Sequence, residues 1–238
     1  VAGGAAALNQ VLERDADGLM HRTRTRPLPD GRLKTPVSMS FGLLLSFIGL
    51  LELWWAVNVT AATVAGITLV SYLLLYTPLK QRTWLSTLVG AFPGALPPVI
   101  GWSAVTGDIA LPAIALFGIV FVWQIPHFFA IAWIHREDYA RADIPLLPVL
   151  EPDGRSTGRQ AYLYTALLLP VSLTPVLTGL GSSYYAITAV ALGVALLVLS
   201  IRFAKRLSIE TARHLFLASI TYLPLLWSAL VIDHLWLS

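Results

Sequence analysis

The sequence predicts an all-α polytopic membrane protein, and three observations support that prediction. Of the 238 residues, 56% are hydrophobic and only 12% are charged, whereas soluble domains carry about 25% charged residues. The apolar runs are unbroken and about 20 residues long, the length that spans a bilayer as a helix. All 16 Lys and Arg residues fall in four segments at or beyond the ends of these runs. Together these features exclude an ordinary soluble domain, a disordered chain and a β-barrel with alternating polarity.

Seven full spans are expected from the apolar runs. Their ranges are 36–57, 59–76, 86–106, 109–134, 161–180, 183–203 and 214–236. The third span contains Pro93, Pro97 and Pro98, so we expect it to be kinked or broken, because proline cannot donate a helical hydrogen bond. Residues 1–12 look like the end of a further helix, and we therefore expect the chain to be truncated at its N-terminus.

The basic residues predict how the spans cross the membrane. They lie in the segments 13–35, 77–85, 135–160 and 202–213, and the intervening loops contain none. By the positive-inside rule these four segments are cytoplasmic and the C-terminus is outside. Topology therefore explains the net charge of +3, and we expect no nucleic-acid partner. The absence of cysteine excludes disulfides and thiolate chemistry.

The first polar cluster contains Asn9, Glu13 and Asp17, which are four residues apart. On a helix such side chains stack along one face. Three oxygen-bearing side chains suit a hard cation such as Mg²⁺, which typically binds one or two carboxylates together with substrate phosphates. Arg22 and Arg26 follow as bidentate phosphate donors. The alternative is a solvated turn with local ion pairs; Asn9 favours a site, because an amide beside an apolar stretch needs a partner.

A second cluster runs from the fourth span into the loop that follows it. His127 lies inside the span among aromatic residues, and an ionisable group within a membrane is a functional candidate. The alternative is a histidine that only forms a hydrogen bond to a neighbouring helix. Asp138 follows His127 by 11 residues, so a continuous helix would bring the two to within about 20° of one face. Glu137 and Asp138 on their own are typical of solvated loops.

A third cluster, Tyr76 to Thr83, carries Lys80 and Arg82. Two bases in a short loop usually mark topology, but a lysine near a diphosphate would act as a point-charge clamp. The Gly90 position allows close backbone approach near a cavity, although an ordinary kinked span has the same composition. The remaining acids near span ends are interpreted as interfacial or loop residues without function. They are Glu52, Asp108 and Asp233.

Three stretches carry a resemblance to one family. They are Asn9-x-x-x-Glu13-x-x-x-Asp17 continuing to Arg26-Pro-Leu-Pro, Tyr76-Thr-Pro-Leu-Lys80 with Pro93-Gly-Ala-Leu-Pro-Pro98, and Trp123-Gln-Ile-Pro-His127-Phe-Phe continuing to Asp138-Tyr139. The chain resembles the heme O synthases, the protoheme IX farnesyltransferases among the UbiA-type intramembrane prenyltransferases. The specific motifs cover about residues 5–150. The second motif lacks the aspartate-rich form of the wider superfamily, as in heme O synthases, which favours heme over a phenolic acceptor.

This resemblance implies both an architecture and a reaction. The fold would be a UbiA-type bundle of transmembrane helices around a central cavity, here without its first helix, forming a single transmembrane prenyltransferase domain over residues 1–238. The reaction would transfer a farnesyl group from farnesyl diphosphate to the 2-vinyl group of heme B, giving heme O and diphosphate. Mg²⁺ would be the cofactor and a bacterial inner membrane, with its lipids, the location. Heme A synthase or a terminal oxidase would be candidate protein partners.

The resemblance also assigns roles to individual residues. The catalytic and metal-binding residues would be Asn9, Glu13, Asp17 and Asp138. The diphosphate would be bound by Arg22, Arg26, Lys80 and Arg136, and heme B by His127. Two other functions stay open: a related intramembrane prenyltransferase with an aromatic or quinone-precursor acceptor, and a non-catalytic heme-binding or transport protein of the membrane.

Overall fold

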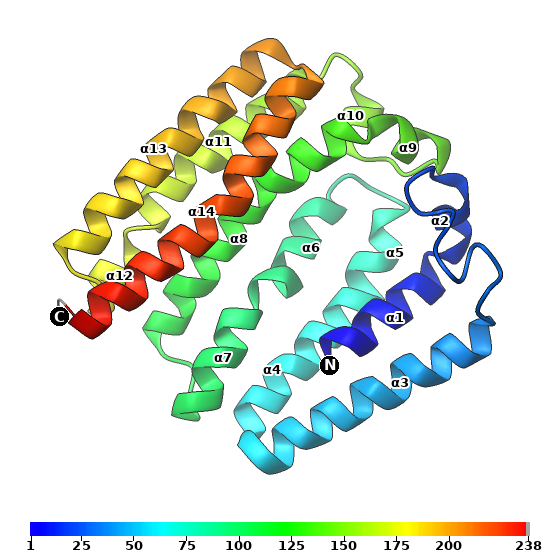
Figure 1. The fold of residues 1–238 in the computed structure, drawn as a ribbon, viewed down its shortest axis with the longest axis horizontal. Coiled ribbons are helices and arrows are strands. Elements are labelled where there is room, and N and C mark those ends of the chain that lie inside the picture. The colour runs from blue at the N-terminus through cyan, green and yellow to red at the C-terminus, as the bar shows by residue number, and fades with distance from the viewer. Residues whose placement is uncertain (237–238) are drawn as a thin grey trace. The chain divides into compact units, whose positions relative to one another are not determined.

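The computed structural model describes residues 1–236, and within that range every regular element is a helix. The all-α prediction is thereby confirmed. The chain forms two compact units, of which the first comprises Val1–Ile109 and His135–Val149. The second comprises Ala110–Ile134 and Leu150–Ser238. Figure 1 labels the helices of both units.

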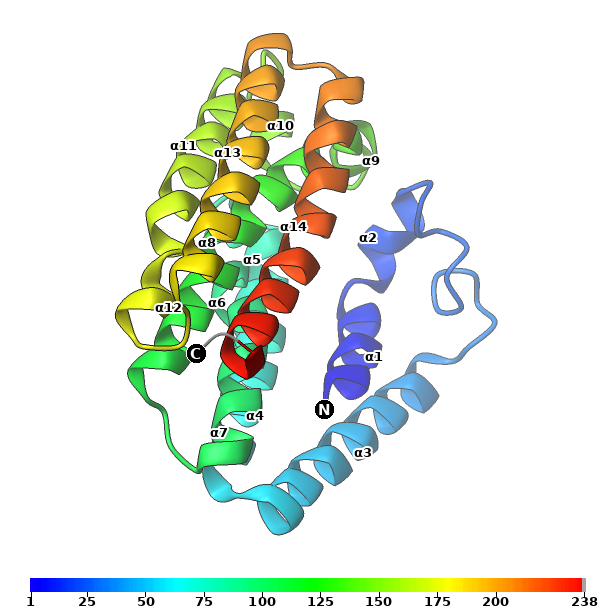
Figure 2. The same ribbon diagram turned by 60° about the vertical axis from the view of Figure 1, so that its left-hand side comes forward.

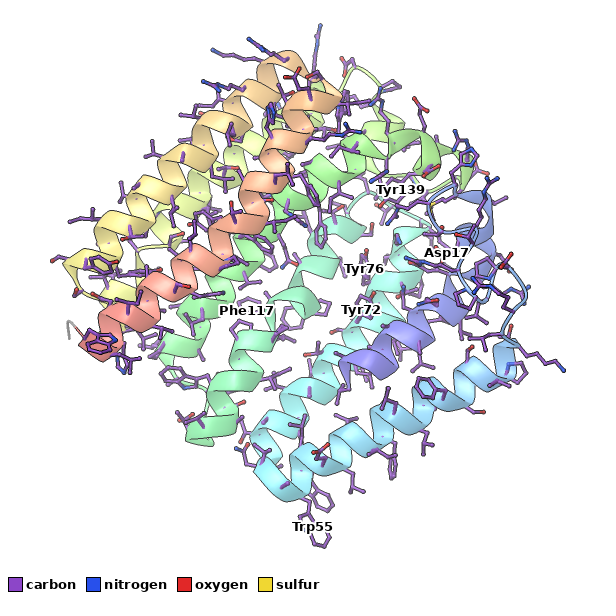
Figure 3. The ribbon with its side chains drawn as sticks, in the orientation of Figure 1. Asp17, Trp55, Tyr72, Tyr76, Phe117 and Tyr139 are labelled. Atoms are coloured by element: carbon purple, nitrogen blue, oxygen red, sulfur yellow. The ribbon has the colours of Figure 1, made fainter. Side chains whose placement is uncertain are left out.

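The first unit is built from short and interrupted helices. They are α1 (Ala2–Leu12), α2 (Arg14–Leu19), α3 (Thr35–Glu52), the π-helix η1 (Leu53–Val57), α4 (Val59–Val70), the π-helix η2 (Ser71–Tyr76), α5 (Thr77–Lys80), α6 (Ser86–Ala95), α7 (Pro97–Thr106), α9 (Arg136–Arg141) and most of α10 (Leu147–Leu150). Asn58 starts α4 as its N-cap, because its side-chain oxygen accepts the backbone N–H of Ala61 at 2.8 Å. In η1, Trp55 is 86% exposed, and its side chain projects away from the helices (Figure 3).

Four long helices form the second unit. They are α8 (Leu111–Ile134), α11 (Arg155–Val171), α13 (Ser183–Arg206) and α14 (Ile209–Trp236), with the short α12 (Thr174–Leu177) between two of them. Helix α11 packs against α8 and α13, and α14 packs against α13 and α8 (Figure 2), which closes a four-helix bundle. Gly158 lets α11 and α13 approach closely, because a Cβ atom there would lie only 2.9 Å from Ala204 Cα.

Within residues 1–236, seven helices are long and apolar enough to cross a membrane, as predicted. They are Thr35–Val57, Val59–Lys80, Ser86–Thr106, Leu111–Ile134, Arg155–Leu177, Ser183–Arg206 and Ile209–Trp236. The predicted ranges are too short at basic ends, since the fifth helix begins at Arg155 and the sixth extends to Arg206. A helix can extend past its apolar residues into an Arg- or Lys-containing turn, because the long side chains of these residues place their charge in water.

The predicted interruption of the third span is confirmed. Helix α6 ends at Ala95 and α7 begins at Pro97, with Pro93 inside α6. Gly90 allows a close approach to a side chain, because a Cβ atom there would lie 2.5 Å from the ring of Tyr76. Gly90 therefore lets η2 pack on α6.

Small residues hold α1 against α3. Ser38, Gly42 and Ser46 are buried at four-residue spacing along α3, and α1 lies beside this stripe (Figure 1). A Cβ atom on Gly4 of α1 would lie 2.7 Å from the carbonyl oxygen of Gly42. In lipid, helices associate through such close packing rather than through the hydrophobic effect. This contact fixes the helix that carries the first polar cluster.

Candidate functional site

The first polar cluster keeps its helical spacing across a bend. Helix α1 ends at Leu12 and α2 begins at Arg14, with Glu13 between them at φ −96° and ψ 6°. The i to i−4 hydrogen bonds nevertheless continue, because Glu13 N–H donates to Asn9 O at 2.9 Å and Asp17 N–H donates to Glu13 O at 2.8 Å. The Asn9 side-chain amide also donates to Glu13 Oε2 at 3.3 Å. Asn9 and Glu13 therefore stack as the sequence predicts.

Lys80 forms the next layer of the cluster. Its Nζ lies 2.8 and 2.9 Å from the two carboxylate oxygens of Glu13. The side chains are only 15% and 6% exposed, respectively. Beside this pair, the Thr77 hydroxyl lies 3.0 Å from Asn9 Oδ1 and 2.9 Å from Tyr72 O. One face of α5 is thus docked on the Asn9–Glu13 face.

Asp17, labelled in Figure 3, is the most deeply buried acid of the cluster. Only 1% of its side chain is exposed. Arg26 Nη1 donates to Asp17 Oδ2 at 2.7 Å, and the Arg26 side chain is 35% exposed. The Thr23 hydroxyl donates to the backbone oxygen of Asp17 at 2.8 Å. These bonds fold the loop after α2 back over the carboxylate, so that a partly exposed guanidinium covers a buried acid.

Asp138 reaches the same unit from far along the chain. Its Oδ1 accepts the backbone N–H of His21 at 3.1 Å and a hydrogen bond from Arg141 Nη1 at 2.6 Å. The Asp138 side chain is 12% exposed and that of Arg141 is 44% exposed. Asp138 therefore anchors α9 to the loop that follows α2, next to the residues that hold Asp17.

The two remaining predicted phosphate ligands differ in burial. Arg22 is exposed, and no carboxylate within residues 1–236 forms an ion pair with it. Arg136 is half-buried at the start of α9. Arg22 follows directly on His21, whose backbone binds Asp138.

The prediction that His127 and Asp138 share one helix face is wrong. Helix α8 ends at Ile134, and His135 adopts φ −108° and ψ 20° before α9 begins at Arg136. His127 belongs to the second unit and Asp138 to the first. The helix can break there because the polar run after Ile134 offers side-chain and backbone partners that the apolar span lacks.

The carboxylates of the cluster are suited to a metal ion that binds together with diphosphate. Within residues 1–236, no three His, Asp or Glu side chains converge as a metal site on their own. Glu13, Asp17 and Asp138 each hold one lysine or arginine instead. Mg²⁺ rarely uses an all-protein cage and usually combines one or two carboxylates with substrate phosphates. Carboxylates beside cations are suited to binding a metal and its anionic partner at once.

A mostly apolar cavity of about 640 Å³, whose lining includes Glu52, lies within the first unit. Residues of α1, α3, η1, α4, η2 and α7 line it, among them Ala5, Leu53, Leu69 and Tyr72. Tyr72 links the cavity to the polar cluster, since its backbone oxygen accepts the Thr77 hydroxyl. An apolar chain with a polar head would therefore find both of its environments in this unit.

His127 lines a second cavity, of about 600 Å³, which lies between α8 and α14 of the second unit. The lining is almost wholly apolar and aromatic: Trp123, His127, Ile131, Phe216, Ile220, Leu223, Pro224 and Trp227. The rings of Trp123 and His127 are stacked, with centroids 5.0 Å apart. His127 Nδ1 lies 2.8 Å from Ser219 Oγ. The hydrogen bond to a neighbouring helix, one of the two roles considered for His127, is therefore present.

Sequence reasoning missed several participants. Thr77 falls inside a quoted motif, but a threonine at a span end gives no signal of its own. Ser219 likewise has no sequence signal, because its partner is 92 residues away. Asp233, interpreted as an end residue without function, is fully buried and accepts the backbone N–H and the hydroxyl of Ser182. It closes the N-terminus of α13.

Comparisons with known proteins identify the family of the chain. The UbiA prenyltransferase family model matches residues 1–229. The chain is 48% identical over 233 residues to a protoheme IX farnesyltransferase of Solibacter usitatus, covering 98% of this chain and 80% of the relative. It is 45% identical over 240 residues to that of Koribacter versatilis, covering 98% and 77%, and 44% identical over 237 residues to that of Opitutus terrae, covering 99% and 80%.

A solved structure of a digeranylgeranylglyceryl phosphate synthase shares the fold. The TM-score is 0.76 at 18% identity, over 97% of this chain and 80% of the other. A family match over nearly the whole chain, close relatives of the same family and seven membrane-length helices all agree. The chain is a multi-pass integral membrane protein, and it belongs to the UbiA prenyltransferase family.

Proposed function

We propose that the protein transfers the farnesyl group of farnesyl diphosphate to the 2-vinyl group of heme B, giving heme O and diphosphate. One observation supports the donor half above all: Glu13 and Asp17 are paired with Lys80 and Arg26. Two of the proposed metal-binding acids are thus already paired with two of the proposed diphosphate-binding bases. Heme B is the proposed acceptor because the similar proteins of Solibacter usitatus and Koribacter versatilis are protoheme IX farnesyltransferases.

In the cluster, the acidic side chains would bind a metal ion and the basic side chains would bind the phosphate oxygens. Enzymes of the UbiA family generally use a divalent metal to bind diphosphate. For this chain we propose Mg²⁺ held by Asn9, Glu13, Asp17 and Asp138, which would neutralise the charge of the leaving diphosphate. Arg26 and Lys80 would turn from their carboxylates to the phosphate oxygens, joined by Arg22 and Arg136. Arginine suits this role because its planar fork binds two oxygens at once.

Breaking the allylic C–O bond gives diphosphate and a farnesyl cation, so the positive charges around the diphosphate lower the barrier. The apolar cavity of the first unit is the proposed site of the farnesyl chain. Its walls would keep water from the cation until the acceptor reacts. The vinyl terminal carbon then bonds to the farnesyl C1, water adds to the resulting cation beside the porphyrin, and a proton leaves.

Heme B is proposed to contact His127 in the aromatic cavity of the second unit. The stacked rings of Trp123 and His127, and the Phe216 ring 5.1 Å from His127, offer flat apolar surfaces. A neutral imidazole can also ligate iron.

We further propose that residues 1–238 act as a single prenyltransferase domain. It would lie in a bacterial inner membrane, with the basic loops cytoplasmic and the C-terminus outside. Heme A synthase or a terminal oxidase would then be a natural recipient of the product.

Reconstitution tests the proposal directly. The purified protein is incubated with heme B, farnesyl diphosphate and Mg²⁺, and the porphyrin is analysed by mass spectrometry alongside diphosphate release. We expect heme O and an equal amount of diphosphate, both lost with Asp17→Asn. Prenylation of a phenolic acid but not of heme would overturn the acceptor. No diphosphate release with both substrates present would overturn the enzymatic function.

A further inference from the structure

His127 and its closest polar neighbour lie on two helices of the second unit. His127 is on α8 and Ser219 on α14, which packs along α8 (Figure 2). Ser219 is fully buried, at 0% exposure. Its Oγ lies 2.8 Å from His127 Nδ1. Because either nitrogen of a neutral imidazole can carry the proton, the direction of this bond decides what the ring can do.

A second contact of Ser219 fixes that direction. Ser219 Oγ lies 2.6 Å from the carbonyl oxygen of Phe216, one helical turn earlier. A carbonyl oxygen only accepts, so the single hydroxyl hydrogen of Ser219 is used there. Ser219 Oγ must therefore accept from His127, whose Nδ1 carries the proton. The other ring nitrogen, Nε2, then keeps its lone pair.

Ser219 also holds the neighbouring ring. Its backbone oxygen accepts the indole N–H of Trp123 at 2.8 Å. One residue thus fixes both members of the stacked Trp123–His127 pair, whose ring planes are inclined by 23°. Both rings line the 600 Å³ cavity. The geometry goes beyond packing, because it selects the tautomer of a ring that faces a cavity.

We infer that Ser219 is a positioning residue that holds His127 as the Nδ1–H tautomer, so that Nε2 is available to ligate the iron of the heme substrate. The second half of this inference rests on the proposed function. A hydrogen bond from the far ring nitrogen of a ligating histidine fixes the ring orientation and makes the ligating nitrogen more basic. Ser219 would therefore tune heme binding without touching heme.

The tautomer is tested on the protein without any substrate. Histidine-labelled ¹⁵N NMR in detergent reports the protonated ring nitrogen, and His127→Gln identifies the signal. We expect Nδ1–H in the unaltered protein, a shift towards mixed tautomers in Ser219→Ala, and recovery in Ser219→Thr, whose hydroxyl can make the same helical bond. Nε2–H in the unaltered protein would overturn the inference, as would an unchanged spectrum in Ser219→Ala.

The ligand role is tested by heme titration. In the ferrous form, resonance Raman spectroscopy reports the iron–histidine stretching band, whose frequency falls when the Nδ1–H hydrogen bond is weakened. We expect this band in the unaltered protein, a lower frequency and several-fold weaker heme affinity in Ser219→Ala, and recovery in Ser219→Thr. His127→Gln should lose the band.

Ser200→Ala is the matched control. Ser200 is also fully buried, and its hydroxyl donates to the carbonyl oxygen of Leu197 at 2.9 Å, three residues earlier. It lies on α13, whereas His127 lies on α8 and Ser219 on α14. Ser200→Ala should leave the His127 spectrum and heme affinity unchanged; equal effects of both variants would assign Ser219 to stability alone and overturn the inference.

The two proposals can fail separately. A band that depends on Ser219, with no heme O formed in reconstitution, would refute the proposed reaction and support this inference. Heme O formation without an iron–histidine band would support the proposed reaction and refute this inference.

Discussion

Asp17 and Asp233 are both buried carboxylates, at 1% and 0% exposure, but they are satisfied in different ways. Asp17, in the first unit, is bound to the guanidinium of Arg26, which is 35% exposed. Asp233, in the second unit, accepts hydrogen bonds from the backbone N–H and the hydroxyl of Ser182. A carboxylate at a helix N-terminus is stabilised by uncharged donors and by the helix dipole, so Asp233 needs no counterion.

The difference separates a candidate ligand from a structural cap. Arg26 has a long side chain that is 35% exposed, and under the proposed function it would release Asp17 and bind the diphosphate instead. The donors to Asp233 belong to Ser182, the N-cap residue of α13, whose hydroxyl oxygen also accepts the N–H of Tyr184. They cannot move away without disrupting the start of α13. Burial alone therefore does not distinguish these two acids, whereas the kind of donor that each one binds does.

The largest effect is expected from breaking the buried pair of the first unit on one side only. Lys80→Met leaves the 6%-exposed Glu13 carboxylate without a counterion, which should lower the free energy of unfolding by about 3–5 kcal/mol. Thermal unfolding in detergent measures this change. The double variant Lys80→Met with Glu13→Gln should recover part of the loss, since no charge is stranded. A double variant no more stable than the single one would contradict the pairing. The exposed Lys205→Met is the control, with a change within about 0.5 kcal/mol.

The next effect is on catalysis. Asp17→Asn should lower kcat/KM for farnesyl diphosphate about 10²–10³-fold, as is typical when one preorganised electrostatic group is removed from a site. It should also raise the Mg²⁺ concentration needed for half-maximal diphosphate release. Asp233→Asn is the matched change in the second unit and should leave both quantities within about twofold. Equal losses in the two variants would remove the distinction between ligand and cap.

The free energy of unfolding should fall when the hydrogen bonds between Asp233 and Ser182 are weakened. Asp233→Asn replaces one accepting oxygen with a donor, so one hydrogen bond from Ser182 is lost. Loss of such a buried bond costs about 1–3 kcal/mol, measured again by thermal unfolding. Ser182→Ala removes the hydroxyl donor to Asp233 and also the N-cap bond that this oxygen accepts from Tyr184 N–H at 3.2 Å, so it should cost at least as much as Asp233→Asn. An Asp233→Asn protein as stable as the original would show that the cap contributes nothing.

The smallest effect is expected at Arg141. This residue is 44% exposed and pairs with Asp138, and such exposed pairs contribute about 0.2–1 kcal/mol. Arg141→Ala should therefore change the melting temperature little, because His21 N–H still holds the carboxylate. Loss of stability comparable to that of Lys80→Met would show that α9 depends on this ion pair.

The sequence predicts most of the fold because the bilayer simplifies the problem. Apolar runs of membrane length give the spans, and Pro93 and Pro97 predict the interruption between α6 and α7. The four-residue spacing of Asn9 and Glu13 predicts their contact, since the backbone ladder alone brings them together. A contact between residues four apart on a helix can therefore be predicted without knowledge of the tertiary structure.

The parts that could not be predicted depend on distant residues. The break at His135 ends the helix that would have joined His127 to Asp138. Ser219 meets His127 across 92 residues, so no spacing rule relates them. Asp233 resembles any acid at a span end until α13 is placed against it. In each case the chemistry follows from tertiary packing.

The bond between Ser182 and Asp233 also has a consequence for the order of assembly. The two residues are 51 positions apart, so on the ribosome the N-terminal turn of α13 emerges long before the carboxylate that closes it. Until α14 has been inserted, the backbone N–H and the hydroxyl hydrogen of Ser182 must be satisfied by water or lipid head groups. The contact that joins the start of α13 to the end of α14 can therefore form only after almost all of α14 has been synthesised.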